Sequence, residues 1–262
     1  MFSLFLLNGL KFNEKYMKYT DLLVGGLCLF CACSSPQKNP IDYVDPFIGT
    51  GFHGHTYPGA TTPFGAVQLS PDTRRGNWDA SSGYHYSDST ILGFSHTHLS
   101  GTGCQDFGDV LLRPTTQPVR LEGEGDIFLP AAFSHDSEKA TPGYYAVTLS
   151  DEQIKVELAA STFAGMHRYN YLNDKDASVI VDLTHILNTD DFIYEAELKQ
   201  TADNEIVGMR RTRSWVDNQY IYFVLQFSKP IQEWQQLNDK QGVAHFGQER
   251  EVLAKVGLSI VS

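Results

Sequence analysis

Histidine, aspartate and glycine are concentrated in one short run of this 262-residue chain, from Gly93 to Asp109. The run holds His96, His98 and Asp106 among several glycines. Glycine at this density indicates backbone with positive φ, or backbone that another group approaches closely. Imidazole and carboxylate side chains add hydrogen-bonding groups that can hold a ligand. We therefore expect a binding site in this part of the chain, here called the Gly-rich run.

A second loop, rich in glycine and proline, spans residues 45–65 and carries His53 and His55. A loop this long in a compact domain usually has a function. Trp78 follows it, flanked by polar residues. The flat face of this indole fits the C–H face of a pyranose ring, while its neighbours bond the hydroxyls. A half-buried tryptophan at a domain edge fits the pattern equally well.

The histidines also suggest a metal site. Each loop carries a pair of histidines spaced two residues apart, and on a strand such a pair shares one face. Together with Asp106 or Asp109, the two pairs could bind a transition metal. Each imidazole could equally bond a backbone carbonyl or a carboxylate. Glycoside hydrolysis needs two carboxyl groups across one bond, and the sequence marks no such pair among the nearby aspartates, which are Asp72, Asp79, Asp88, Asp106 and Asp109.

Strands separated by turns must position these loops. Apolar residues alternate with polar ones in residues 154–160, 179–183, 221–227 and 255–261, as in half-buried strands of antiparallel sheets. Turn residues separate such segments, and no helical stripe exceeds a couple of turns. The pattern predicts an all-β domain over residues 41–262, built as an antiparallel two-sheet β-sandwich.

The N-terminus has the features of an export signal. Leu22–Ala32 is an apolar run of eleven residues, which suits a signal-peptide core and is too short for a transmembrane helix. Cys33 follows it, as at a bacterial lipoprotein processing site. We therefore expect an export segment over residues 1–33, lipidation of Cys33 and a polar tether over residues 34–40. The basic start that such a signal needs is at Met17, so residues 1–16 are expected to be spurious.

Charge and cysteine content narrow the possible partners. The formal net charge is -11, which argues against nucleic acid or an anionic membrane surface as a partner. Cys104 is the one cysteine after the export segment, so no internal disulfide can form. A buried structural thiol is the usual role of such a residue, and a catalytic nucleophile is the alternative.

The loop segments resemble glycoside hydrolase family 92, the calcium-dependent, inverting exo-α-mannosidases. The resemblance covers essentially all of residues 41–262. Its densest matches are residues 43–65, 67–73, 82–88 and 93–103, which include Tyr-Val-Asp-Pro-Phe-Ile-Gly-Thr-Gly and Gly-Phe-Ser-His-Thr-His-Leu-Ser-Gly-Thr-Gly.

The resemblance implies an N-terminal β-sandwich of the galactose-mutarotase-like supersandwich type. In the family this domain packs on an (α/α)₆ barrel that carries both catalytic carboxylates and most calcium ligands. This chain contains only the sandwich, so no catalytic residue and no calcium ligand is assigned to it. Trp78 matches the family's tryptophan near the leaving-group sugar, and the loops around the other candidate substrate-binding residues are expected to shape the mannose pocket: His53, His55, His96, His98 and Asp106.

Four readings follow from this comparison of residues. The leading one is the N-terminal, carbohydrate-contacting domain of an exported α-mannosidase acting on mannose-rich N-glycans, inactive as a fragment that stops at Ser262. The second is a stand-alone carbohydrate-binding lipoprotein, and the third is one chain of a two-chain enzyme with a separately encoded barrel. The fourth is a histidine-based metalloprotein. The first three place the chain in the periplasm or on the surface of a Gram-negative bacterium, attached by its lipid anchor.

Overall fold

The computed structural model describes residues 38–121, 127, 129–190 and 192–262. The chain divides into two units, Met1–Tyr43 and Val44–Ser262. In the first unit, the 3₁₀ helix η1 (Pro40–Tyr43) is described, and the carboxylate of Asp42 accepts the N–H of Asn39 at 3.0 Å. The predicted export segment, including Met17 and Cys33, lies outside the described residues.

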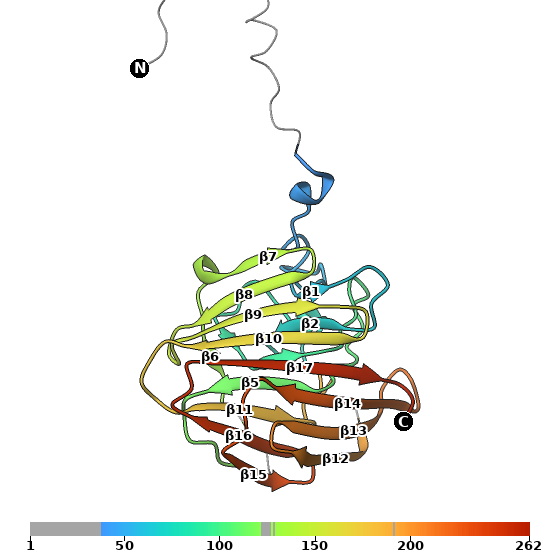
Figure 1. Ribbon diagram of the computed structural model, residues 1–262. Coiled ribbons are helices and arrows are strands. Elements are labelled where there is room, and N and C mark those ends of the chain that lie inside the picture. The colour runs from blue at the N-terminus through green and yellow to red at the C-terminus, as the bar shows by residue number, and fades with distance from the viewer. Residues whose placement is uncertain (1–37, 122–126, 128, 191) are drawn as a thin grey trace, which may run out of the picture. The chain divides into compact units, whose positions relative to one another are not determined.

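The second unit contains a seven-stranded sheet with the strand order β1-β2-β4-β5-β11-β16-β15 (Figure 1). Every strand pair in this sheet is antiparallel over the described residues. Strand β1 lies near the end of the second loop. Strand β4 opens the Gly-rich run, whose remaining residues lead to β5. The strands are β1 (Ala60–Thr61), β2 (Gln68–Asp72), β4 (Gly93–Ser95), β5 (Leu111–Thr115), β11 (Ala177–Asp182), β15 (Glu233–Asn238) and β16 (Gln241–Gly247).

An eight-stranded antiparallel sheet has the order β12-β13-β14-β17-β10-β9-β8-β7. In Figure 1 its long strands cross the view from β7 down to β12. Its strands are β7 (Lys139–Thr141), β8 (Tyr144–Leu149), β9 (Ile154–Ala160), β10 (Ala164–Tyr171), β12 (Phe192–Ala202), β13 (Glu205–Arg213), β14 (Gln219–Phe227) and β17 (Glu251–Ser259).

Short elements complete the unit. Strands β3 (Thr90–Ile91) and β6 (Ala131–Ala132) form a two-stranded sheet. Two further 3₁₀ helices, η2 (Trp78–Ala80) and η3 (His135–Ser137), lie in the connections. Within the described residues, no helix is both long enough and apolar enough to cross a membrane.

One hydrophobic core lies between the two large sheets. Strand β17 buries every second side chain, from Val252 to Leu258, and β9 does the same from Ile154 to Leu158. Phe94 and Phe246 join this core from the seven-stranded sheet. Alternation places one face of each strand in the core, so the period-two pattern of the sequence produces a sandwich.

The predicted all-β, antiparallel fold is confirmed. Residues 154–160 form β9 as expected, and the last strand begins four residues earlier than predicted, at Glu251. A tight turn separates β15, which ends at Asn238, from β16, which begins at Gln241. Residues 45–59 form no strand, in agreement with the loop predicted over residues 45–65, but Ala60–Thr61 near its end form β1, which pairs with β2.

Candidate functional site

A pocket on the second unit lies where the Gly-rich run meets connections from both sheets. Its cavity volume is about 660 Å³, within the usual range for a small-molecule site. Four segments line it: η2, the Gly-rich run, the connection that follows β11, and the β13–β14 connection with the neighbouring strand ends. The lining residues are Trp78, Gly103, Cys104, Gln105, Asn188, Asp190, Phe192, Arg213, Ser214 and Trp215.

Trp78 is held at the start of η2, with 55% of its surface exposed. The side chain of Asn77 caps this short helix by accepting the N–H of Asp79 at 3.0 Å. His55 meets the indole edge-on, with ring centroids 4.3 Å apart, and His53 lies 5.2 Å away. Local capping and two imidazoles therefore fix the indole while leaving much of it open to solvent.

Trp215 provides a second exposed indole, 71% exposed, in the β13–β14 connection. Its backbone N–H donates to the Asp106 carboxylate at 3.2 Å. The N–H of Phe107 donates to the same carboxylate at 2.7 Å. Burial raises the pKa of Asp106, and these two hydrogen bonds oppose the rise. Asp106 thus joins the Gly-rich run to the segment that carries Trp215.

Asp109 makes a second connection between the same two segments. Its buried carboxylate pairs with the Nε of Arg210 at 2.9 Å. It also accepts the Thr97 hydroxyl and the Gln219 side-chain amide, each at 2.7 Å. Arg210 lies in β13 and Gln219 opens β14. The hairpin that carries the second indole is therefore fixed to the Gly-rich run by buried, charge-assisted hydrogen bonds.

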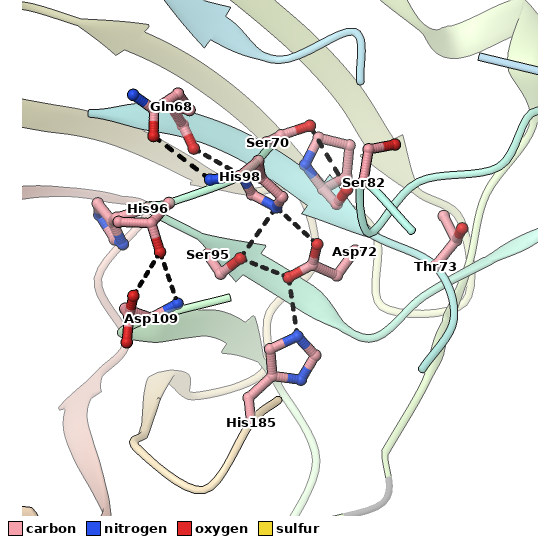
Figure 2. A network of polar contacts seen from close by, with 12 residues as sticks. Gln68, Ser70, Asp72, Thr73, Ser82, Ser95, His96, His98, Asp109 and His185 are labelled. Carbon is pink, nitrogen blue, oxygen red and sulfur yellow. Dashed lines mark hydrogen bonds and ion pairs between the residues drawn. The ribbon is translucent and has the colours of Figure 1, made fainter. Parts of the chain in front are cut away.

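Outside the pocket lining, Asp72 is the centre of a buried polar network (Figure 2). Its carboxylate pairs with the Nε2 of His98 at 2.7 Å and with the Nε2 of His185 at 2.9 Å, and it accepts the Ser95 hydroxyl at 2.5 Å. Burial alone would raise the pKa of Asp72, but the two imidazoles outweigh it and lower this pKa well below its usual value. The carboxylate is therefore ionised.

His98 has an acceptor at each ring nitrogen. Its Nδ1 lies 2.7 Å from the carbonyl oxygen of Gln68, and its Nε2 faces the Asp72 carboxylate. Both contacts are hydrogen bonds only when both nitrogens carry protons. The imidazole thus joins β2 to the Gly-rich run through both of its ring nitrogens.

The same network positions the connection that follows β11. His185 lies early in this connection and is held by Asp72, while Arg210 donates to the carbonyl oxygens of Leu183 and His185. Asn188 and Asp190, further along, line the pocket. The polar wall of the pocket therefore depends on buried groups that do not touch it.

His96 belongs to a different buried chain, which links the two large sheets. Its Nδ1 donates to the Val110 carbonyl at 2.6 Å, so its Nε2 must accept from the Nε2 of His167 at 3.0 Å. The Nδ1 of His167 then accepts the Tyr169 hydroxyl at 2.9 Å. Burial lowers the pKa of His96 to about 4, and that of His167 falls well below its usual value for the same reason. Both imidazoles are neutral.

The predicted site residues therefore occupy different places. Trp78 lines the pocket, and His53 and His55 contact its indole. The Nδ1 of His53 also lies 2.5 Å from an Asp79 oxygen. The remaining three are buried and do not line the pocket: His96 and His98 lie in separate networks, and Asp106 bonds the backbone of Trp215. A substrate-binding role for each of the six residues stays a prediction.

The structure gives no support to the metal interpretation. Over the described residues, no three side chains of histidine, cysteine, aspartate or glutamate gather in a way that could hold a metal ion. His96 and His98 diverge into separate networks, and His53 and His55 pack on an indole. Cys104 is partly exposed and lines the pocket.

Sequence reasoning missed the half of the pocket that comes from residues 188–215. Trp215 has the same signal that marked Trp78, an indole among polar and turn residues, and could have been found in that way. Asn188, Asp190 and Arg213 have no local signal, because only the pairing of the sheets brings them to the Gly-rich run. His185 and Arg210 were missed for the same reason.

The pocket has the composition of a sugar-binding site. Two exposed indoles supply flat apolar surface, and amide, carboxylate and guanidinium groups supply donors and acceptors for hydroxyls. The amide nitrogen of Gln105, on the pocket wall, is buried and has no hydrogen-bond partner among the described residues. Buried polar groups usually have partners, so this donor is one that a ligand could satisfy.

Comparison with known proteins identifies the class. The profile of the glycosyl hydrolase family 92 N-terminal domain matches residues 43–259. The chain belongs to this family and contains its N-terminal domain.

Solved structures of family members agree with this assignment. The GH92 α-mannosidase BT3965 from Bacteroides thetaiotaomicron, solved in complex with mannoimidazole, is 35% identical and superposes with a TM-score of 0.77 over 85% of this chain. The GH92 glycosyl hydrolase ccman5 is 27% identical, with a TM-score of 0.71 over 84% of this chain. The chain spans 32% of the length of each of these structures.

A curated relative gives a similar picture from a fungus. An uncharacterized secreted glycosidase of Arthroderma benhamiae is 28% identical over 193 residues, which are 66% of this chain and 24% of the relative. The chain is thus homologous to part of longer glycosidases, among them α-mannosidases.

Proposed function

We propose that this chain supplies the sugar-contacting wall of an exported, exo-acting α-mannosidase. The observation that carries the proposal is the pocket in which Trp78 and Trp215 both stand exposed beside Asp190, Arg213 and Gln105. An indole covers the C–H face of a pyranose, and the polar groups bond its hydroxyls. The α-mannosidase relatives give the class of sugar.

The chemistry of bond cleavage is assigned to residues outside this pocket. Inverting hydrolysis uses an acid and a base, two carboxyl groups about 6.5–9.5 Å apart. Of the described residues that line the pocket, Asp190 is the one carboxylate. We therefore propose that the catalytic pair belongs to an (α/α)₆ barrel, in the same or a separately encoded chain, and that this chain alone does not hydrolyse glycosides.

Calcium is proposed for a complete enzyme only. Calcium takes six to eight oxygen ligands, several of them carboxylates. The described residues do not fit such a site, because no group of three or more histidine, cysteine, aspartate or glutamate side chains among them is arranged to hold a metal ion.

The setting of the enzyme is part of the proposal. The fungal relative is called a secreted glycosidase, which supports export. Attachment to the outer membrane through a lipid on Cys33, and a mannose-rich N-glycan as substrate, rest on the sequence patterns and the family resemblance. Globomycin-sensitive processing of the precursor would test the lipid anchor.

The test is a titration of the full chain with mannose and α-1,2-mannobiose, followed by tryptophan fluorescence, with and without calcium. Released mannose is assayed in parallel. The variants are Trp78→Ala and Trp215→Ala, and the matched control is Phe64→Ala, which removes a fully exposed aromatic side chain away from the pocket. We expect saturable binding without hydrolysis, weakened about tenfold by either tryptophan variant and unchanged in the control.

Two outcomes would contradict the proposal. Release of mannose by this chain alone would show that it holds a catalytic pair. Failure of the folded chain to bind either sugar would show that this pocket is no sugar site by itself. If the chain binds sugar and its native host encodes no barrel that associates with it, the stand-alone carbohydrate-binding lipoprotein would be favoured.

A further inference from the structure

A second pocket, apart from the one lined by the tryptophans, lies at the edge of the eight-stranded sheet. Its volume is about 430 Å³, and Phe47, Tyr86, His135 and Glu138 are among the residues that line it. It shares no lining residue with the first pocket. Neither the family match nor the proposed function assigns it a role.

Glu138 organises this pocket from behind. Its side chain is 1% exposed, and it accepts the hydroxyl of Tyr145 at 2.6 Å and that of Tyr84 at 3.1 Å. It also lies 2.5 Å from the Nδ1 of His135. Two tyrosine hydroxyls and one imidazole thus converge on a single buried carboxylate.

The carboxylate also fixes His135. With its Nδ1 held against the Glu138 carboxylate, the Nε2 is the ring nitrogen of His135 left for another hydrogen bond, and it accepts one in the tautomer that carries its proton on Nδ1. The His135 side chain is 30% exposed, and among the described residues none is recorded as bonding this nitrogen. The pocket wall therefore carries an oriented ring nitrogen that a ligand hydroxyl could reach.

Aromatic rings form the rest of the wall. Tyr86 stacks on His135, with centroids 4.1 Å apart and planes inclined by 13°. Phe47 meets Tyr86 edge-on, with centroids 6.1 Å apart. The N–H of Tyr86 donates to the carbonyl of Thr50 at 2.8 Å, which fixes the ring relative to the second loop.

The chemistry of the wall selects a ligand class. Asp45 adds a carboxylate, and no lysine or arginine lines the pocket among the described residues, so anions such as phosphate are excluded by charge. Acceptors beside aromatic rings suit a ligand with hydroxyl donors and an apolar C–H face. Its volume accommodates one pyranose ring.

We propose that the pocket of Phe47, Tyr86 and His135 is a second carbohydrate subsite, which holds a pyranose unit through a hydroxyl donated to the Nε2 of His135. The choice of a sugar as ligand rests on the proposed function. The location of the site does not, because it follows from the contacts in this pocket alone. A domain with two such subsites would hold a branched or extended glycan at two points, which raises its apparent affinity without new contacts at the first pocket.

The test uses the full chain labelled with ¹⁵N-histidine and titrated with methyl α-D-mannopyranoside. Long-range ¹H–¹⁵N spectra follow His135 directly, while tryptophan fluorescence follows the first pocket separately. We expect a saturable shift of the His135 Nε2 signal that persists in the Trp78→Ala, Trp215→Ala double variant. Tyr86→Ala should weaken this response about tenfold, and the matched control Tyr194→Ala, an equally exposed tyrosine elsewhere, should leave it unchanged.

The two sites fail in distinguishable ways. A fluorescence response without any shift at His135 would overturn the second subsite and leave the proposed function intact. A shift at His135 without a fluorescence response would support the second subsite and count against sugar binding at the first pocket. If Tyr86→Ala does not fold, His135→Asn replaces it. Calorimetry should then show one binding step where the native chain shows two. Two steps in the His135→Asn variant would overturn the proposal. A shift caused by tetramethylammonium and not by the sugar would overturn the pyranose assignment.

Discussion

The Asp106 carboxylate accepts the backbone N–H of Trp215 at 3.2 Å, across 109 residues of sequence. One aspartate of the Gly-rich run therefore helps to position an indole that is carried by a hairpin of the other large sheet. Its neighbour Asp109 holds Arg210 at the base of the same hairpin. Through these contacts the Gly-rich run positions a binding surface while keeping its own acidic groups buried.

Replacing Asp106 with alanine should weaken sugar binding at the Trp78 pocket about tenfold, because Trp215 loses its anchor and must be ordered by the ligand. The measurement is the fluorescence titration with α-1,2-mannobiose. The matched control is Asp151→Ala, which removes a similar side-chain-to-backbone hydrogen bond, at 3.1 Å to Ala132, away from the pocket. Equal affinity in both variants would show that Asp106 does not position the indole.

Replacing Asp72 with asparagine should lower the free energy of unfolding by about 3–5 kcal/mol, because two buried imidazoles lose their counter-ion. Urea unfolding at pH 7 measures the change. The control is Asp88→Asn, which breaks a partly exposed pair with Arg74 at 2.6 Å and should cost about 1 kcal/mol or less. Similar losses in the two variants would mean that Asp72 contributes no more than a surface ion pair.

Acid should destabilise the fold through His96. Its pKa is about 4 in the folded chain and 6.5 in the unfolded chain. The unfolded chain therefore binds more protons between these values, so stability is complete above pH 6.5 and is lost as the pH falls toward 4. This residue accounts for about 3 kcal/mol over that window. Asp72, whose pKa is lowered from 3.8, adds a further loss only below that value.

The measurement is the urea midpoint as a function of pH between 4 and 7. His96→Gln should be less stable than the native chain at pH 7 but should show a flatter pH dependence. An unchanged slope in this variant would mean that another group causes the acid sensitivity.

Gly83→Ala should destabilise the chain severely. The φ of Gly83 is +87°, and a Cβ at this position would lie 2.0 Å from an Asp72 carboxylate oxygen. Gly101→Ala is a matched control with φ +71° and no atom within 4 Å of the added carbon, so it should cost only the backbone strain of about 1–2 kcal/mol. Thermal unfolding compares the two, and equal melting temperatures would contradict a steric conflict with Asp72.

The fold could be predicted because its signal is local. Alternation of apolar and polar residues defines β9 and β17, and turn residues separate the strands. The structure of each segment can therefore be predicted from its own residues. Trp78 could be found for the same reason, because its polar neighbours are adjacent in sequence.

The rest of the site depends on pairings between distant segments. His98 meets Asp72 across 26 residues and His96 meets His167 across 71, and nothing in the sequence distinguishes these partners from other polar side chains. The histidine pairs thus suggested a metal site, whereas the sandwich directs one member of the second pair to each of two separate networks. Asn188, Asp190 and Arg213 reach the pocket only through sheet packing.

The contacts from Asp106 and Asp109 to the β13–β14 hairpin also bear on how the chain folds. They close loops of 109 and 110 residues. Contacts of such separation form slowly, because closing a long loop first costs the unfolded chain conformational entropy. The ability to bind sugar should then recover after the burial of the core during refolding. A ligand-binding assay in a refolding experiment would therefore report the arrival of the fully native state, which fluorescence of the core alone would miss.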